Sequence, residues 1–174
     1  MTIEGIELLK KYEGCRLKAY RCPAGVLTIG YGNTTYLKGE KVKEGDTITQ
    51  EEADKLFKDT VDKFEYQVKM ILGDTLKAIL PESSISALVS LAYNIGIGAF
   101  SRSTLLKIIR DNKNNLKDIR IQFMKWVYAN GKVLNGLVAR REAEYKLYEK
   151  GILSQYNKQE QEQIFGEQFK CMYK

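Results

Sequence analysis

The sequence predicts an α+β fold: a small N-terminal lobe with a short antiparallel β-meander, a linking helix and a mostly helical C-terminal lobe. Two observations lead to this prediction. Short β-prone pieces separated by glycines lie between residues 16 and 35. Capped stretches with helical apolar spacing then fill most of the chain from residue 49 to residue 150.

The first lobe begins with a short helix. Thr2 is a suitable N-cap, and Gly14 can take the left-handed conformation that ends a helix, so Glu13 occupies the last turn. Two strands are expected next, over 17–20 and 26–30, and they form the meander.

The linking helix and the C-terminal lobe follow from capping signals. Thr49 and Glu52 form a capping box at the start of a helix that runs to about Leu72. The later helices are expected to start at Ser83 or Ser84, at Ser101 or Ser103, at Asn115 and at Asn135. Their expected ends are Ile95 before Gly96, about Asp111, Ala129 before Asn130-Gly131, and Gly151.

We expect one domain over residues 1–151, with lobes of about 1–60 and 73–151 joined by the helix over about 50–72. The segment 152–174 is Gln-rich and poorly patterned, and is expected to be an extension or a frayed helix. A chain of 174 residues with 44% hydrophobic and 29% charged residues suits one compact domain and excludes a large multidomain protein.

The net charge of +6 comes entirely from residues 103–150, which hold eleven basic and five acidic residues. A local basic surface indicates a polyanionic partner, such as nucleic acid, a membrane surface or an acidic cell-wall polymer. The alternative is an ordinary solvated helix face rich in lysine.

The chain has no histidine, which excludes Ser-His and Cys-His catalysis and histidine zinc sites. Acid–base chemistry must therefore use carboxylates, Tyr, Lys or Cys. The three cysteines have no CxxC spacing, so no metal site is expected, and their odd number leaves at least one thiol unpaired. The N-terminal residues lack the apolar stretch of a signal peptide or a membrane span.

Glu13 is the candidate general acid. A carboxylate in the last turn of a helix meets the negative end of the helix dipole, which disfavours its charged form. The alternative is a solvated glutamate beside Lys10 and Lys11. Without further support, Thr28 is a strand residue and Cys22, before Pro23, is a turn residue.

Further support comes from a resemblance. The segment from Glu13 to Thr34 resembles the catalytic signature of the phage-type lysozymes, or endolysins, of glycoside hydrolase family 24. Four later segments resemble the same family in order, at 44–49, 87–96, 98–106 and 126–144, so the similarity covers about residues 3–151. It implies a lysozyme-like fold with a sugar cleft between the lobes. The implied activity is that of a muramidase, which hydrolyses the β-1,4 bond between N-acetylmuramic acid and N-acetylglucosamine in peptidoglycan without a metal or organic cofactor.

The resemblance implies catalytic roles for three residues. Glu13 matches the general acid, Thr28 matches the threonine that helps to hold the attacking water, and Cys22 occupies the place of a second acid. Three explanations stay open: a Cys22 thiolate favoured by nearby basic residues replaces the charge, Glu13 works with a water held mainly by Thr28, or another acid reaches the site. Asn33 stands where family members commonly have His, and a neutral turn residue is sufficient there.

Five residues are expected saccharide contacts in the helical lobe: Tyr93, Asn94, Ser103, Thr104 and Asn135. Trp126 is a further candidate, but its helical spacing with Phe123 favours a core position. Arg140 and Arg141 either bind anionic peptide stems and support Glu13, or pair with Glu142 and Glu144 on a solvated helix.

Two other functions remain possible on the sequence alone. A lytic transglycosylase would use Glu13 as acid and then base and leave a 1,6-anhydro sugar, and a non-catalytic module would bind cell wall or nucleic acid. For the muramidase, the expected partner is bacterial peptidoglycan, with no nucleic acid, no stable membrane anchor and a monomeric chain. Such an endolysin would wait in the host cytoplasm until a holin opens the way to the wall or periplasm. Cys15 and Cys22 could pair only if their Cα atoms came within about 7 Å.

Overall fold

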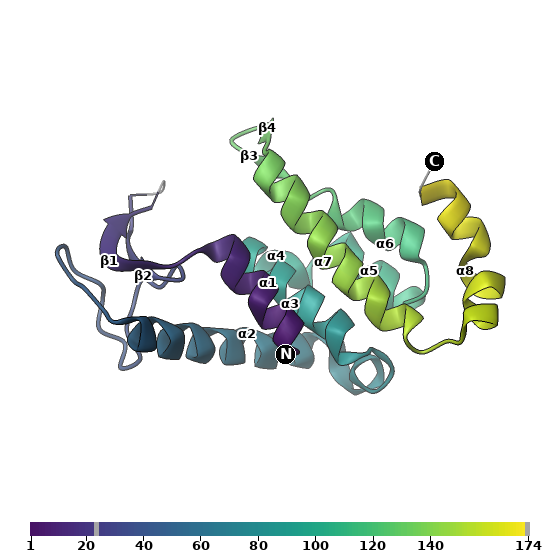
Figure 1. Cartoon of the computed structure of the whole chain (residues 1–174), viewed down its shortest axis with the longest axis horizontal. Helices are drawn as coiled ribbons and strands as arrows, with labels where there is room; N and C mark the ends of the chain where they lie inside the picture. Colours follow the sequence, from purple (N-terminus) through teal and green to yellow (C-terminus); the bar gives the residue numbers. More distant parts are fainter. Residues whose placement is uncertain (23–24, 173–174) are drawn as a thin grey trace. The chain divides into compact units, whose positions relative to one another are not determined.

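The computed structural model describes residues 1–22 and 25–172 of the chain, and side chains up to residue 168. It is mostly helical with two small antiparallel hairpins (Figure 1). The elements are α1 (Ile3–Glu13), β1 (Arg16–Arg21), β2 (Leu27–Gly30), α2 (Gln50–Ile79), α3 (Glu82–Ile95), α4 (Ile97–Ser101), α5 (Thr104–Asp111), α6 (Leu116–Phe123), β3 (Tyr128–Ala129), β4 (Lys132–Val133), α7 (Asn135–Leu153) and α8 (Lys158–Met172). The predicted α+β fold class is confirmed.

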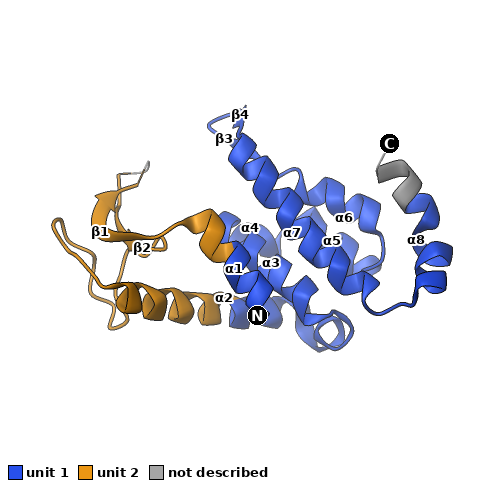
Figure 2. Cartoon of the chain, viewed as in Figure 1, with its two compact units in different colours: residues 1–8, 65–174 blue, residues 9–64 orange. Residues whose placement is uncertain are grey.

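The chain divides into two compact units (Figure 2). Unit 2 comprises residues 9–64, and unit 1 comprises residues 1–8 and 65–174. Helices α1 and α2 each pass from one unit into the other. Among the described helices, none is long and apolar enough to cross a membrane.

Helix α1 is bounded as predicted. The backbone N–H of Gly5 donates to the Thr2 hydroxyl at 3.2 Å, which satisfies one of the free donors of the first turn. Gly14 follows the helix with a φ of 66°, in the left-handed region that favours glycine. Glu13 is therefore the last residue of α1.

The predicted meander is a two-stranded hairpin, in which β1 runs antiparallel to β2. Arg16 lies opposite Gly30, Tyr20 opposite Thr28 and Arg21 opposite Leu27, with an irregularity in the register between the first two pairs. Residues 23 and 24, in the connection, lie outside the described residues.

Helix α2 starts at the predicted capping box, where the Thr49 N–H donates to Glu52 at 2.7 Å and the Glu52 N–H donates to the Thr49 hydroxyl at 3.2 Å. The expected end near Leu72 corresponds to a kink. Gly73 has a φ of 74° and a ψ of 172°, and helical structure resumes beyond it to Ile79.

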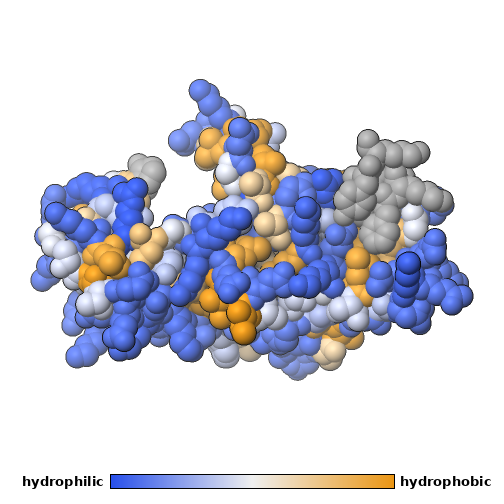
Figure 3. Space-filling view, viewed as in Figure 1, coloured by the Kyte–Doolittle hydropathy of each residue, from blue (hydrophilic) through white to orange (hydrophobic). Residues whose placement is uncertain are grey.

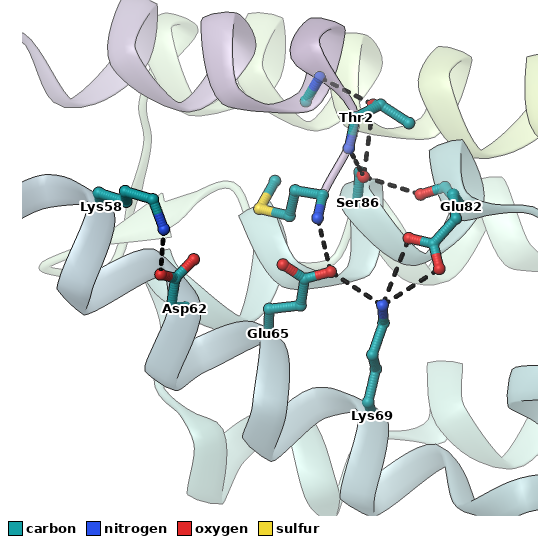
Figure 4. Close-up of polar contacts among 9 residues, drawn as sticks. Thr2, Lys58, Asp62, Glu65, Lys69, Glu82 and Ser86 are labelled. Atoms are coloured by element: carbon teal, nitrogen blue, oxygen red, sulfur yellow. Dashed lines mark hydrogen bonds and ion pairs between the residues drawn. The ribbon is translucent and has the colours of Figure 1, made fainter.

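A polar cluster ties the start of α1 to α2 and α3 within unit 1 (Figure 4). The N-terminal ammonium and Lys69 both contact the Glu65 carboxylate, and Lys69 also contacts Glu82 at 3.1 Å. The Thr2 N–H donates to the Ser86 hydroxyl at 2.9 Å. Burial alone raises the pKa of Glu65, but the hydrogen bonds from the ammonium and Lys69 outweigh it and leave this pKa below its ordinary value of 4.5.

This cluster predicts an acid-sensitive contribution to stability. Because the folded-state pKa of Glu65 is lowered, its stabilisation is fully present above about pH 4.5 and is lost as the pH falls through the folded-state value. We expect Glu65→Gln to lower the free energy of unfolding by about 2 kcal/mol at pH 7 and by progressively less as the pH is lowered below about 4.5, measured by urea denaturation. If the variant and the wild type differed by the same free energy of unfolding at every pH, the stabilisation would not depend on the charge of Glu65.

The core of unit 1 centres on α3, whose residues 84–92 are all buried, and on α7 packed against it. A close contact between Gly151 in α7 and Ser84 in α3 sets how near these two helices lie. A Cβ added to Gly151 would lie 2.3 Å from the Ser84 Oγ and 2.9 Å from the Ser84 backbone nitrogen. The Ser84 hydroxyl also donates to the Tyr148 carbonyl at 2.8 Å, so Ser84 cannot easily move away.

Replacing Gly151 with Ala should therefore destabilise the protein by about 3 kcal/mol, through overpacking against backbone. Gly136→Ala in the same helix is the matched control, since nothing lies within 4 Å of its added Cβ, and it should be neutral or slightly stabilising. Thermal unfolding of both variants tests the comparison. Equal melting temperatures would show that α3 and α7 can separate at little cost.

Several predicted boundaries in unit 1 are wrong. Helix α3 starts at Glu82 after Pro81 rather than at Ser83 or Ser84. The helix expected to reach Ala129 ends at Phe123, because Asn130 and Gly131 take φ values of 51° and 74° and form the turn of the β3–β4 hairpin.

Other capping predictions are confirmed, and the end of the chain is more ordered than expected. Ser103 caps α5 by accepting from the Leu106 N–H, and Asn115 caps α6 by accepting from the Asp118 N–H. Helix α7 continues past Gly151 to Leu153. The predicted extension forms α8, whose Phe165 is fully buried and whose ring lies 5.5 Å from that of Tyr156.

Candidate active site

The Glu13 carboxylate lies beside the glycines that end β2. Its Oε1 is shielded from solvent, and its Oε2 is 3.9 Å from the position that a Cβ on Gly32 would take. Gly32 has a φ of 95°, which favours glycine. The chain therefore leaves open space next to this carboxylate.

Thr28 lies in the middle of the hairpin, opposite Tyr20, and is buried. Its hydroxyl donates to the Val26 carbonyl at 3.0 Å. Because its proton is committed to that carbonyl, the hydroxyl is left as an acceptor and can take a hydrogen bond from a water molecule.

Cys22 follows the end of β1 and is half-buried. Its N–H donates to the Val26 carbonyl at 3.0 Å, and the Gly25 N–H donates to the Cys22 carbonyl at 2.7 Å. Cys15 and Cys22 are both thiols at opposite ends of the extended strand β1, and six extended residues span about 20 Å. This separation excludes a disulfide between them.

The basic residues near Cys22 in the sequence are Arg16, Lys18 and Arg21, and two of them have other partners. The Arg21 guanidinium donates to Glu44 and to the Gly25 carbonyl, both at 3.1 Å. The Arg16 guanidinium lies 4.4 Å from the centroid of the Tyr20 ring. Arg16 and Arg21 thus each have a defined partner in the hairpin region or in Glu44.

A charged cluster holds the last turn of α1 against α2 in unit 2. Lys10, three residues before Glu13, donates to Asp54 at 2.6 Å, and the Tyr31 hydroxyl donates to the same oxygen at 3.0 Å. Each charge stabilises the other, so the pKa of Lys10 is raised, mainly by the hydrogen bond to Asp54, and the pKa of Asp54 is lowered, mainly by the hydrogen bond from Lys10. Burial raises the pKa of Tyr31.

Asn33 is not simply a solvated turn residue. It is buried, and its side-chain amide donates to the Thr60 hydroxyl at 2.8 Å. A neutral hydrogen bond therefore joins the end of the hairpin to α2.

Unit 1 carries a second candidate region, a hollow of about 660 Å³ beside the β3–β4 hairpin. Its lining is mainly apolar and aromatic, with one amide and one ammonium among its polar groups: Asn94, Ile95, Lys125, Trp126, Tyr128, Ala129, Leu134 and Leu137. Figure 3 shows hydrophobic residues gathered at this hairpin, where Tyr128, Val133 and Leu134 are exposed. Aromatic rings with a few polar groups suit the faces and edges of sugars.

The structure brings only one of the five expected saccharide contacts into this hollow. Asn94 lines it, whereas Tyr93, Ser103, Thr104 and Asn135 are absent from the described lining residues. The Ser103 hydroxyl is used as a helix cap, and Asn135 is the first residue of α7.

Sequence reasoning missed the aromatic part of the hollow. Trp126 is half-buried and lines it, so the expected core position is wrong. Tyr128 and Lys125 were overlooked. The signal was present, because an Asn-Gly pair flanked by β-prone residues is typical of a two-residue hairpin turn.

Arg140 and Arg141 form a buried cluster with Glu144 and not a solvated helix face. Arg140 contacts one Glu144 oxygen at 3.0 Å and Arg141 contacts the other at 2.9 Å. The Ser90 hydroxyl also donates to Glu144, at 2.6 Å. Arg141 and Glu144 are fully shielded from solvent, which excludes a direct contact of Arg141 with peptide stems, and Glu142 pairs instead with Arg120.

An acidic helix terminus next to a short hairpin, in a chain that is otherwise mostly helical, is typical of the lysozyme fold. The sequence profile of the phage lysozyme family matches residues 10–144. The chain is 41% identical over 150 residues to an endolysin of Acyrthosiphon pisum secondary endosymbiont phage 1, covering 84% of this chain and 95% of that one. The chain belongs to the phage lysozyme family.

Two further similarities agree with this assignment. An endolysin of Bacillus phage B103 is 41% identical over 146 residues, which cover 83% of this chain but 52% of that protein, so the chain spans about half of that relative. The muramidase domain of SpmX from Asticaccaulis excentricus superposes with a TM-score of 0.70 at 30% identity, covering 84% of this chain and 95% of that one.

Proposed function

We propose that the chain is a phage endolysin that acts as a muramidase and hydrolyses the β-1,4 bond between N-acetylmuramic acid and N-acetylglucosamine in peptidoglycan. The observation that carries this proposal is Glu13, a carboxyl group with one shielded oxygen at the C-terminal end of α1, beside the hairpin that holds Thr28. Membership of the phage lysozyme family and the endolysin relatives support it.

The proposed reaction is a general-acid hydrolysis. Glu13 donates its proton to the glycosidic oxygen as the bond breaks, and a water that donates a hydrogen bond to the Thr28 hydroxyl attacks the anomeric carbon. The attacking water releases one proton to solvent, and the Glu13 carboxylate takes a proton from solvent before the next turnover. The commitment of the Thr28 proton to Val26 supports this role, since the hydroxyl is then an acceptor for water. Cys22 contributes a thiol at the place of the family's second acid.

The remaining parts of the proposal concern binding and location. The hollow with Asn94, Trp126 and Tyr128 offers stacking surfaces and an amide for the glycan. Tyr93, Ser103, Thr104 and Asn135 stay candidate contacts. Residues 1–151 act as one catalytic domain with α8 as an extension. The enzyme acts on the cell wall as a monomer, after a holin releases it from the host cytoplasm.

Digestion of purified peptidoglycan by the wild-type protein, followed by mass spectrometry, tests the reaction. We expect disaccharide muropeptides with a reducing N-acetylmuramic acid end. Products lighter by one water, with a 1,6-anhydro end, would replace the muramidase with a lytic transglycosylase. Absence of products combined with retained binding to the wall would replace it with a non-catalytic binding module.

A further inference from the structure

Arg16 carries a charge that no acid neutralises in the part of the chain that the structure describes. It is exposed at the start of β1, and its guanidinium carbon lies 4.4 Å from the Tyr20 ring centroid. Arg21, on the same strand, pairs with Glu44 at 3.1 Å. The strand thus holds one arginine with a carboxylate partner and one with an aromatic partner.

The hairpin register places this arginine on the same strand as the residue that lies opposite the proposed water site. Arg16 follows Glu13 by three residues and lies opposite Gly30, which has no side chain to cover it. Tyr20 lies opposite Thr28, and directly opposed residues project from the same face of a hairpin. The contact with Tyr20 therefore holds the Arg16 guanidinium toward the face that bears Thr28.

The contact with Tyr20 brings the guanidinium carbon to 4.4 Å from the ring centroid and uses none of the N–H donors for a carboxylate in the described part of the chain. A guanidinium lying over a ring keeps its N–H donors in its own plane, and this planar fork matches both oxygens of a carboxylate. Because Tyr20 already restricts the side chain, less conformational entropy is lost when an anion binds.

We propose that Arg16, held on Tyr20, binds a carboxylate carried by the muramic acid residue of the substrate and so makes anionic glycan a better substrate than uncharged glycan. This inference rests on the proposed muramidase function. The carboxylate can come from the lactyl group of a peptide-free muramic acid or from the stem peptide of a substituted one. In both cases the group that Arg16 binds is a carboxylate.

The test compares three substrates: intact peptidoglycan, strands freed of peptide by an amidase, and intact peptidoglycan whose carboxylates are converted to methylamides. We expect Arg16→Gln to lower kcat/KM about tenfold on intact peptidoglycan, as for a lost charge-assisted hydrogen bond, and to match the wild type on the methylamide substrate. A loss on intact strands alone assigns the stem peptide, a loss on peptide-free strands alone assigns the lactyl carboxylate, and a loss on both shows that Arg16 accepts either carboxylate.

Matched variants distinguish carboxylate binding by Arg16 from a loss of activity caused by a disturbed hairpin structure. Arg21→Gln removes the other exposed arginine of β1 and should not change the preference between substrates. Tyr20→Phe keeps the ring and should keep the preference, whereas Tyr20→Leu should weaken it. If Arg16→Gln slows all three substrates equally, or none, the proposal is wrong.

A binding measurement distinguishes failure of this proposal from failure of the proposed function. Calorimetric titration with a soluble muramyl dipeptide, which carries a free carboxylate, should give a Kd about tenfold weaker for Arg16→Gln than for the wild type. The titration does not require catalysis, so it tests Arg16 even if no peptidoglycan product forms. An unchanged Kd would overturn the assignment of Arg16.

Discussion

Replacing Glu13 with Gln should lower the rate of peptidoglycan hydrolysis at least about 100-fold, because the amide keeps the shape of the side chain but has no acidic proton to give to the glycosidic oxygen. The side chain sits at the C-terminal end of α1 with one oxygen shielded from solvent, so the substitution removes the proposed acid with little change in packing. The release of reducing ends from purified peptidoglycan measures the effect.

The control is Glu7→Gln, the same substitution at an exposed position of the same helix, which should leave the rate unchanged. Unfolding by urea should give similar stabilities for both variants and the wild type. A Glu13→Gln protein that retains more than about a tenth of the wild-type rate would show that another group supplies the proton, and the assignment of the acid would have to change.

The parts of the structure that local signals determine were predictable from the sequence. The Thr2 cap, the Thr49–Glu52 capping box and the Ser103 cap all bind the backbone groups of their own helices, so their effect can be read within a few residues. The same holds for Gly14 and for the strands around the hairpin turn. These signals place Glu13 and Thr28 in their elements.

Features that depend on distant partners were not predictable. Ser84 looks like a cap, but its hydroxyl bonds to Tyr148, 64 positions later. Ser90 and Glu144 meet across 54 positions, and nothing local to either residue indicates that contact. The aromatic hollow was missed for a different reason, because apolar residues around Trp126 were assigned to a helix that in fact ends at Phe123.

The buried cluster of Arg140, Arg141 and Glu144 predicts the largest effect on stability. Glu144→Gln leaves two guanidinium groups without their carboxylate in a region shielded from solvent, and Arg141 is fully buried. Removing one partner of a buried ion pair typically costs 3–5 kcal/mol, about a third or more of the stability of an ordinary domain. We expect a loss of about 4 kcal/mol in the free energy of unfolding, measured with urea.

Glu142→Gln in the same helix is the matched control, because its ion pair with Arg120 is partly exposed to water and is worth about 1 kcal/mol or less. A triple change of Arg140, Arg141 and Glu144 to apolar residues of similar size should recover part of the loss, since none of the three charges then stays buried without its partner. If Glu144→Gln were no more destabilising than Glu142→Gln, water would have to reach the cluster readily. The interface between α3 and α7 would then be far less closed than the burial of Ser90 and Arg141 implies.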